Sequence, residues 1–146
     1  MSLHASEKQR KRLAACLRDK ALREAGHATV ASFLRIPIAD ISARGTIFAE
    51  SLSDPVAIAA VAWGGFAIPY WTLGYELKPN GVCALLERYR GASDYDTYLL
   101  NEVRDRFGEE PVRQGLLLAK HAIEIRWDTM ETIASELRKE LSGSTL

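Results

Sequence analysis

The residues best suited to chemistry lie in one pentapeptide, Arg23-Glu24-Ala25-Gly26-His27. In a helix, residues four apart lie on one face, so Arg23 and His27 would project side by side. Zinc proteases use two histidines at this spacing to hold one ion, and the glutamate after the first histidine acts as general base toward the metal-bound water. Here Arg23 stands in the place of the first histidine. Glu24 is therefore a candidate general base, and His27 is a candidate metal ligand.

The elements around this pentapeptide are predicted to be mainly helical. Residues 6–34 contain no proline, and their apolar and small residues recur at spacings of three and four, which predicts one long helix or two abutting ones. Residues 38–49 place β-branched and aromatic residues around a turn at Ala43-Arg44-Gly45, which predicts one or two short strands. Another helix is predicted to start at Ser53-Asp54-Pro55, because an oxygen-bearing cap followed by proline is typical of a helix N-terminus.

The segment that follows, residues 55–75, carries no charge over 21 positions, which is long enough to span a membrane. Gly64, Gly65 and Pro69 argue against a membrane span, because they predict a helix of about a dozen residues and then an aromatic-rich loop. We therefore expect a buried core helix. Glycine lets two backbones approach closely, so Gly64 and Gly65 are expected where this helix crosses the helix of the pentapeptide.

The C-terminal part of the chain predicts further helices. Ser93, with Asp96 three residues later, is expected to cap one helix, which Gly108 ends. Pro111 is expected to open a last helix that ends at Ser142-Gly143. We expect about five or six helices in all, with the only β element near residues 38–49.

Composition predicts an ordinary cytoplasmic globular protein. The 19 basic and 19 acidic side chains cancel, which argues against a strongly basic nucleic-acid binder. Cys16 and Cys83 are too few for a disulfide framework, and no secretory signal is expected, so a reducing compartment is predicted. Residues 6–143 are expected to form one domain, and residues 1–5 a disordered tail or a remnant of cloning. No phosphate-binding G-x-x-x-x-G-K-[ST] loop is found, so no ATPase domain is predicted.

Beyond the pentapeptide, the chain resembles the peptidase domain of the FtsH-type zinc metallopeptidases. The run EAGHATVASFL is similar to the active-site helix of that family, which reads H-E-A-G-H-A followed by small and apolar residues. The resemblance covers residues 20–143, without the family's membrane anchor or ATPase. Four further segments resemble family features in the right order: IADISARG for a strand and its turn, Trp63-Gly64-Gly65-Phe66-Ala67 for a core helix, Gly91-Ala92-Ser93-Asp94 for the loop before the third zinc ligand, and the pattern from Trp127 to Leu137 for the closing helix.

This resemblance implies a mainly α-helical, FtsH-type peptidase domain with a zinc site made by His27 and an aspartate. Asp94 is preferred as that ligand because the apolar positions after it match the family's pattern, and Asp96 is the alternative. Arg23 cannot ligate zinc, because its guanidinium is permanently charged and offers no lone pair. It is suited instead to replace the ion by pairing with Asp94 or Asp96, with a further contact to Glu24 as an option.

The sequence leaves three functions open. The leading hypothesis is a non-catalytic peptide- or protein-binding module with a degenerate zinc site and no cofactor. The bound segment would pair with the edge of the strand that runs from Ile38 to Gly45, where a second copy of the chain could also pair. The alternative is an active endopeptidase that holds zinc with an altered ligand set. A weaker alternative is a helical adaptor that contacts nucleic acid through basic residues at positions 8–12.

Overall fold

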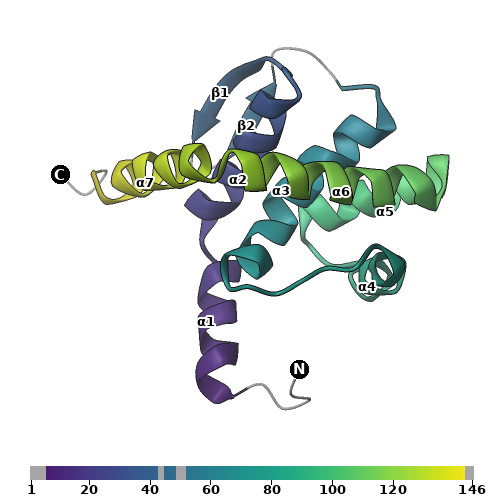
Figure 1. Cartoon of the computed structure of the whole chain (residues 1–146), viewed down its shortest axis with the longest axis horizontal. Helices are drawn as coiled ribbons and strands as arrows, with labels where there is room; N and C mark the ends of the chain where they lie inside the picture. The colour runs from purple at the N-terminus through teal and green to yellow at the C-terminus, as the bar shows by residue number, and fades with distance from the viewer. Residues whose placement is uncertain (1–5, 43–44, 49–51, 144–146) are drawn as a thin grey trace.

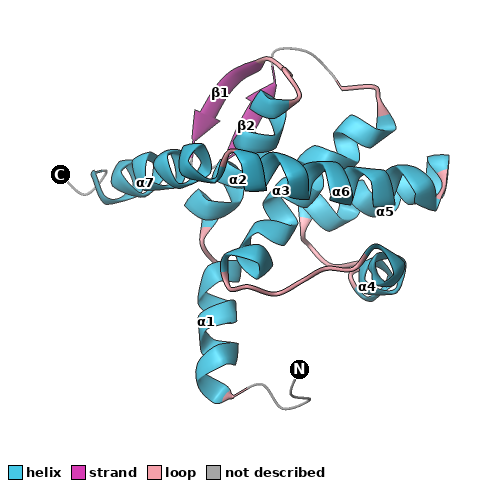
Figure 2. Ribbon diagram, in the orientation of Figure 1, coloured by secondary structure: helices cyan, strands magenta, loops and turns pink. Residues whose placement is uncertain are grey.

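The computed structural model describes residues 6–42, 45–48 and 52–143. These residues form a mainly α-helical protein with a small antiparallel sheet (Figures 1 and 2). Residues 1–5, Ala43 and Arg44 lie outside the described residues, so the expected tail and part of the expected turn are not addressed. The elements are α1 (Glu7–Leu17), α2 (Lys20–Phe33), β1 (Ile38–Ser42), β2 (Gly45–Phe48), α3 (Pro55–Thr72), the 3-10 turn η1 (Pro79–Gly81), α4 (Val82–Arg88), α5 (Tyr95–Phe107), α6 (Glu109–Ile125) and α7 (Trp127–Gly143).

Helix α3 forms the centre of the core. Every residue from Ala59 to Pro69 is buried, because α2, α5 and α6 pack around this helix. A helix that is apolar on all sides must be enclosed, either by protein or by lipid. Here the neighbouring helices enclose it. Among the described residues, no helix combines the length and the hydropathy needed to span a membrane.

Helices α2 and α3 cross at three glycines, as the sequence predicts for Gly64 and Gly65. A Cβ atom on Gly26 would lie 2.1 Å from the carbonyl oxygen of Gly64, so the two backbones are in direct contact there. A Cβ on Gly64 would lie 2.6 Å from a methyl group of Val30, and one on Gly65 would lie 1.9 Å from Nε2 of His27. A methyl group at Gly26 or Gly64 would meet backbone atoms of the other helix, so the helices would have to separate, whereas one at Gly65 would require the His27 ring to move.

The predicted end of α3, the continuous last helix and the predicted number of helices were wrong. Helix α3 continues through Pro69 to Thr72, because its burial on all sides outweighs the one backbone hydrogen bond that a proline removes. The expected last helix is two helices, α6 and α7, which are separated at Arg126. The side chain of Arg126 donates to Ser32 and lies over the ring of Phe33, so contacts with α2 fix this break. The described residues therefore hold seven helices rather than the five or six expected.

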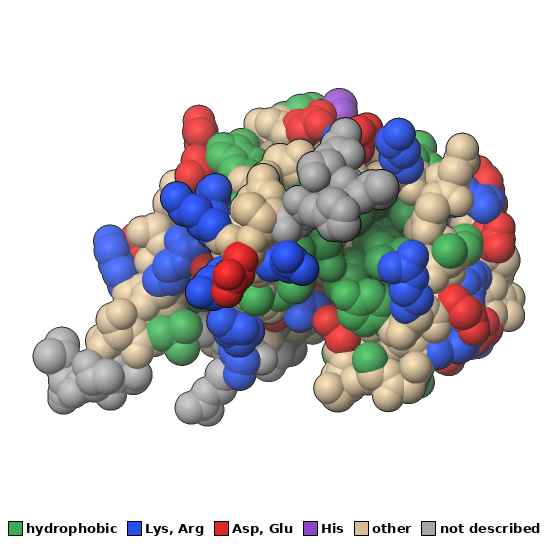
Figure 3. Space-filling view, turned by 90° about the horizontal axis from the view of Figure 1, so that it is seen from below, with side chains coloured by type: hydrophobic (Ala, Val, Ile, Leu, Met, Phe, Trp, Pro, Cys, Tyr) green, Lys and Arg blue, Asp and Glu red, His purple; other side chains and the backbone are tan. Residues whose placement is uncertain are grey.

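The N-terminal run is divided as well, into α1 and α2, which meet at Asp19. Helix α1 projects from the rest of the molecule (Figure 1), and none of its residues is buried. Its side chains at positions 8 and 10–12 are exposed, and Lys and Arg side chains gather on this part of the surface when it is seen from below (Figure 3). Nucleic-acid binding by this helix stays a prediction.

Replacing Gly26 with alanine should destabilise the protein strongly. The added methyl group would meet backbone atoms of Gly64, which cannot rotate away, so α2 and α3 must separate. We expect a loss of about 3 kcal/mol or more in the free energy of unfolding, measured by urea denaturation. The matched control is Gly143→Ala, because nothing lies within 4 Å of a Cβ at that position. An equal loss in both variants would contradict close contact at the crossing.

Candidate functional site

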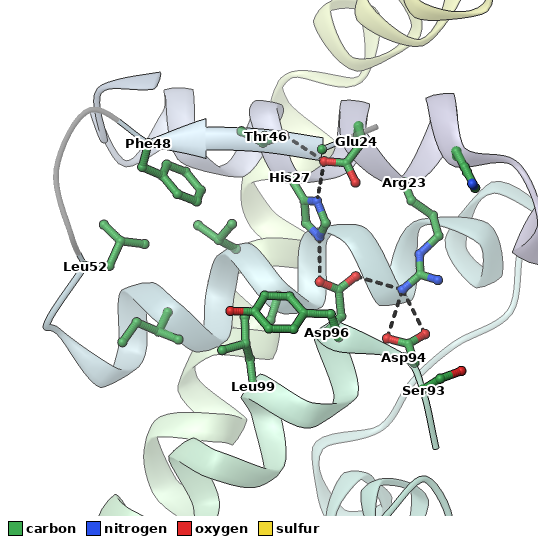
Figure 4. Close-up of a pocket in the computed structure, with 16 residues that line it drawn as sticks. Arg23, Glu24, His27, Thr46, Phe48, Leu52, Ser93, Asp94, Asp96 and Leu99 are labelled. Atoms are coloured by element: carbon green, nitrogen blue, oxygen red, sulfur yellow. Dashed lines mark hydrogen bonds and ion pairs between the residues drawn. The ribbon is translucent and has the colours of Figure 1, made fainter. Parts of the chain in front are cut away.

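Three elements bring the predicted site residues together. Helix α2 starts at Asp19, whose side chain accepts a hydrogen bond from the backbone N–H of Leu22. Its side chains Arg23, Glu24 and His27 are partly buried and face β2 and the start of α5. Strand β2 lies over this helix, and the start of α5 lies against it (Figure 4). The structure therefore places Arg23, Glu24, His27, Asp94 and Asp96 in one cluster.

Arg23 bonds to both candidate aspartates. Its Nη2 atom donates to Oδ2 of Asp94 at 2.9 Å and to Oδ2 of Asp96 at 2.8 Å, and it is 3.2 Å from Oδ1 of Asp94. The three side chains are largely shielded from water, with exposed fractions of 23% for Arg23, 18% for Asp94 and 7% for Asp96. The pairing that the sequence predicts is thus formed with both aspartates. The optional contact of Arg23 with Glu24 is not formed, because Glu24 bonds to other groups.

His27 connects the aspartates to Glu24. Its Nε2 atom lies 2.8 Å from Oδ1 of Asp96, and its Nδ1 atom lies 3.0 Å from Oε1 of Glu24. The hydroxyl of Thr46 donates to the same Glu24 oxygen at 2.8 Å, which fixes β2 to α2. A neutral imidazole has only one N–H, so a carboxylate at each ring nitrogen favours the doubly protonated, charged form.

The charges of the cluster shift each other's pKa. Burial opposes the charged form of His27, but the Asp96 and Glu24 carboxylates outweigh it and raise the pKa of His27 to about 10. Burial also opposes ionisation of Asp96 and Glu24. Hydrogen bonds and charge attraction from their partners still hold the pKa of each carboxyl below its ordinary value. The aspartates likewise raise the pKa of Arg23 despite its burial. Arg23, Glu24, His27 and Asp96 are thus charged at neutral pH.

The two aspartates have different positions. Asp94 is the N-cap of α5 and accepts a hydrogen bond from the backbone N–H of Thr97 at 3.1 Å. The expected cap at Ser93 with Asp96 as its partner was therefore wrong by one residue. Asp96 is buried in the first turn of α5 and is the aspartate that faces His27. Of the two aspartates, Asp96 is therefore the one that contacts His27.

These side chains do not fit the zinc ion that the family resemblance implies. Catalytic zinc takes three protein ligands that offer lone pairs at about 2.0–2.2 Å. Arg23 offers none and holds a positive charge against both aspartates, while both nitrogens of His27 point at carboxylates. Within the described ranges, no three His, Cys, Asp or Glu side chains are arranged to hold a metal ion.

The cluster forms one wall of a pocket of about 520 Å³, the site pocket. Its other wall is apolar, with Ile58, Val61 and Leu99 from α3 and α5. The strand that borders the pocket is β2, through Gly45, Thr46 and Phe48, rather than β1, among the residues that the structure describes (Figure 4). Sequence reasoning missed these β2 residues. The period of two along a strand could have grouped Thr46 with Phe48, but no pattern indicated Leu52, which also lines the pocket.

Comparison of the chain with protein-family models, with curated proteins and with solved structures finds no match. The function is therefore inferred from the residues of the site and from the fold that positions them. The ion pairs of Arg23 and His27 lead to two tests of stability.

Replacing Arg23 with methionine should leave the shielded carboxylate of Asp94 without a counter-charge and Asp96 with His27 as its remaining cation. We expect a loss of about 3 kcal/mol in the free energy of unfolding, because breaking a buried ion pair on one side leaves an uncompensated charge. Adding Asp94→Asn to this variant should restore part of the loss, because it removes the carboxylate left unpaired and asparagine can still cap α5. The control is Arg90→Met, which removes an exposed guanidinium paired with Glu87 and Asp105. A loss in the Arg23 variant no larger than in the control would show that the cluster contributes nothing to stability.

The stability of the protein should also decrease at alkaline pH through His27. Because folding raises the pKa of His27 from its ordinary 6.5 to about 10, its contribution is complete below the lower value and is lost as pH rises through the higher one. Between these values the free energy of unfolding should fall by up to about 1.4 kcal/mol per pH unit. The difference between the wild-type protein and His27→Gln isolates this contribution from other titrating groups. A difference that is constant over this range would contradict the charged imidazole.

Proposed function

We propose that the chain is a non-catalytic peptide-binding protein of the FtsH-type peptidase fold, in which Arg23 takes the place of the zinc ion. The observation that carries this proposal is the position of the Arg23 guanidinium. It lies one helical turn from His27 and bonds to both aspartates at the start of α5. A permanent positive charge thus holds the carboxylates that a metal ion would otherwise hold.

The arrangement of the elements supports this fold assignment. The family resemblance implies a motif helix, then a short strand, then a glycine-rich core helix against the motif helix, and finally an acidic turn that opens a later helix. In this protein, α2 is followed by the β1–β2 hairpin, Gly64 and Gly65 of α3 contact α2, and Asp94 and Asp96 open α5 beside Arg23. This order and these contacts support the proposal, although β2 rather than β1 borders the site pocket among the described residues.

The partners of Glu24 argue against an active endopeptidase. A general base needs an oxygen that is free to accept a proton from water, and its pKa should lie near the working pH. Oε1 of Glu24 already accepts from Thr46 and pairs with the charged His27, and the pKa of Glu24 lies below its ordinary value. Two structural partners thus share Oε1, and the lowered pKa makes the carboxylate a weak base.

An extended peptide is the ligand that the site pocket favours. Strand β2 pairs with β1 on one edge, and in the described part of the chain no strand pairs with its other edge. Such an edge can accept a further strand through backbone hydrogen bonds. The pocket below it contains three cationic side chains and three carboxylates once His27 is charged, so its charges balance and its apolar wall selects an uncharged side chain. The binding edge thus belongs to β2, whereas the sequence-based proposal used β1.

Binding of an unfolded chain tests this function. We expect fluorescein-labelled lactalbumin that has been reduced and carboxymethylated, and so lacks fixed structure, to bind the protein without being cleaved. Phe48→Asp places a charge in the pocket wall and should abolish the increase in fluorescence anisotropy. Leu117→Asp, which changes a side chain that is 55% exposed on α6, is the matched control. Cleavage of the probe, or equal binding by the two variants, would overturn the proposal.

The role of Arg23 as a replacement for zinc has a separate test. The purified wild-type protein should contain no stoichiometric zinc by elemental analysis, and EDTA should leave its melting temperature unchanged. Arg23→His removes the internal cation and supplies a ligand, so this variant should bind one zinc ion per chain and gain stability from it. Zinc in the wild-type protein, lost together with stability on adding EDTA, would favour the active peptidase. Failure of the variant to bind zinc would show that His27 and Asp96 no longer hold ligand geometry.

A further inference from the structure

A second pocket, of about 350 Å³, lies between the C-terminal end of α3 and the junction of α6 with α7. It shares no lining residue with the site pocket. We call it the tryptophan pocket, because two of the three tryptophans of the chain line it. The side chains that decide its chemistry are those of Trp71, Tyr75, Glu76, Lys120, Glu124 and Trp127.

Its three aromatic side chains come from three separate segments. Trp71 belongs to the last turn of α3, and Trp127 opens α7. Tyr75 follows Gly74, whose positive φ of 82° turns the chain back so that the N–H of Tyr75 bonds to the carbonyl of Tyr70 at 2.9 Å. All three aromatic side chains are only partly buried, so part of each faces the pocket or its mouth. Exposed aromatic area gathered from three segments is typical of a binding site.

Trp71 differs from the core tryptophan in its hydrogen bonding. The indole N–H of Trp63 is buried and donates to the carbonyl of Val112 at 2.9 Å. The indole N–H of Trp71 is also buried, but it has no acceptor in the structure as described. An unpaired buried donor costs free energy, and a small rotation of the indole toward the pocket would let a ligand oxygen accept from it.

The charges around the tryptophan pocket favour a cation. The carboxylates of Glu76 and Glu124 are both exposed at its rim, while Lys120 supplies one positive charge. The buried side chain of Ile123 also lines the pocket, so a strongly hydrated ion would lose water there without replacement. A cation that is large, apolar on its surface and weakly hydrated meets both conditions. Aromatic faces add attraction for such a cation.

We propose that the tryptophan pocket binds a methylated ammonium group that has an oxygen acceptor close by. Trp71, Tyr75 and Trp127 surround the methylated nitrogen, Glu76 and Glu124 supply the counter-charge, and the oxygen accepts from the N–H of Trp71. The methylated ammonium is shared by a small choline-type molecule, whose hydroxyl lies two carbons from the nitrogen, and by a trimethyllysine side chain of a partner protein, for which the partner's backbone would supply the oxygen. The amine of Lys120 competes with the ligand for the two carboxylates.

Nuclear magnetic resonance of the three indole N–H groups tests this site with an internal control. Choline should shift the Trp71 and Trp127 resonances and leave that of Trp63 unchanged, because Trp63 is fully buried elsewhere in the core. Its uncharged analogue, 3,3-dimethyl-1-butanol, has the same shape and should bind at least about tenfold more weakly if the charge is recognised. Equal binding of the two probes, or no selective shift with choline, would overturn the proposal.

Variants and a peptide probe complete the test. Glu76→Gln and Glu124→Gln change exposed side chains and should each weaken choline binding by about threefold, whereas Lys120→Met should strengthen it. Trp127→Leu should weaken it by about tenfold. A short peptide with trimethyllysine that binds more tightly than choline assigns the site to a partner protein, and the reverse order assigns it to a small molecule. Unchanged affinity in all four variants would contradict the site.

Discussion

The close contact of α2 with α3 is the constraint on which the rest of the structure depends. Gly26 and Gly64 let the two backbones touch, and no larger side chain fits between them. This contact fixes the face of α2 that carries Arg23 and His27 relative to the core. Helix α5 packs on the same central helix, α3, so its first turn is held against the face of α2 that carries Arg23 and His27. A contact between two backbones, with no side chain between them, thus sets where α2 presents the charges of the site.

The charged cluster is a chain of alternating signs. It runs from Asp94 through Arg23, Asp96 and His27 to Glu24, and each neighbouring pair is joined by an ion pair or a hydrogen bond. In surroundings that exclude most water, each charge is strongly stabilised by its neighbours and would be costly without them. Loss of one member therefore weakens the next pair as well. The cluster acts as one unit that joins α2, β2 and α5.

The sequence predicts the features that follow from local pattern or from simple electrostatics. The glycine pair in an apolar helix predicts the crossing. The family resemblance placed the aspartates near Arg23, and the charge of the guanidinium then predicted the pairing. Pro69 was expected to end the helix, because proline removes a backbone hydrogen bond, but the helix continues because it is buried on all sides. The break at Arg126 depends on contacts with Ser32 and Phe33, which are remote in the chain. Helix α5 is capped by Asp94 rather than by Ser93, one residue earlier. Several neighbouring side chains here carry oxygens that could cap a helix, so the sequence does not decide between them.

The packing of His27 on Gly65 connects the position of the imidazole with the separation between α2 and α3. The ring lies so close to the backbone of α3 that even a methyl group on Gly65 would overlap it. A movement of α2 away from α3 would carry this ring with it and change its distance to Asp96 on α5, whereas Glu24 lies on the same helix as the ring and would move with it. His27 thus connects the site pocket, which it lines, with the central helix α3, on which it packs.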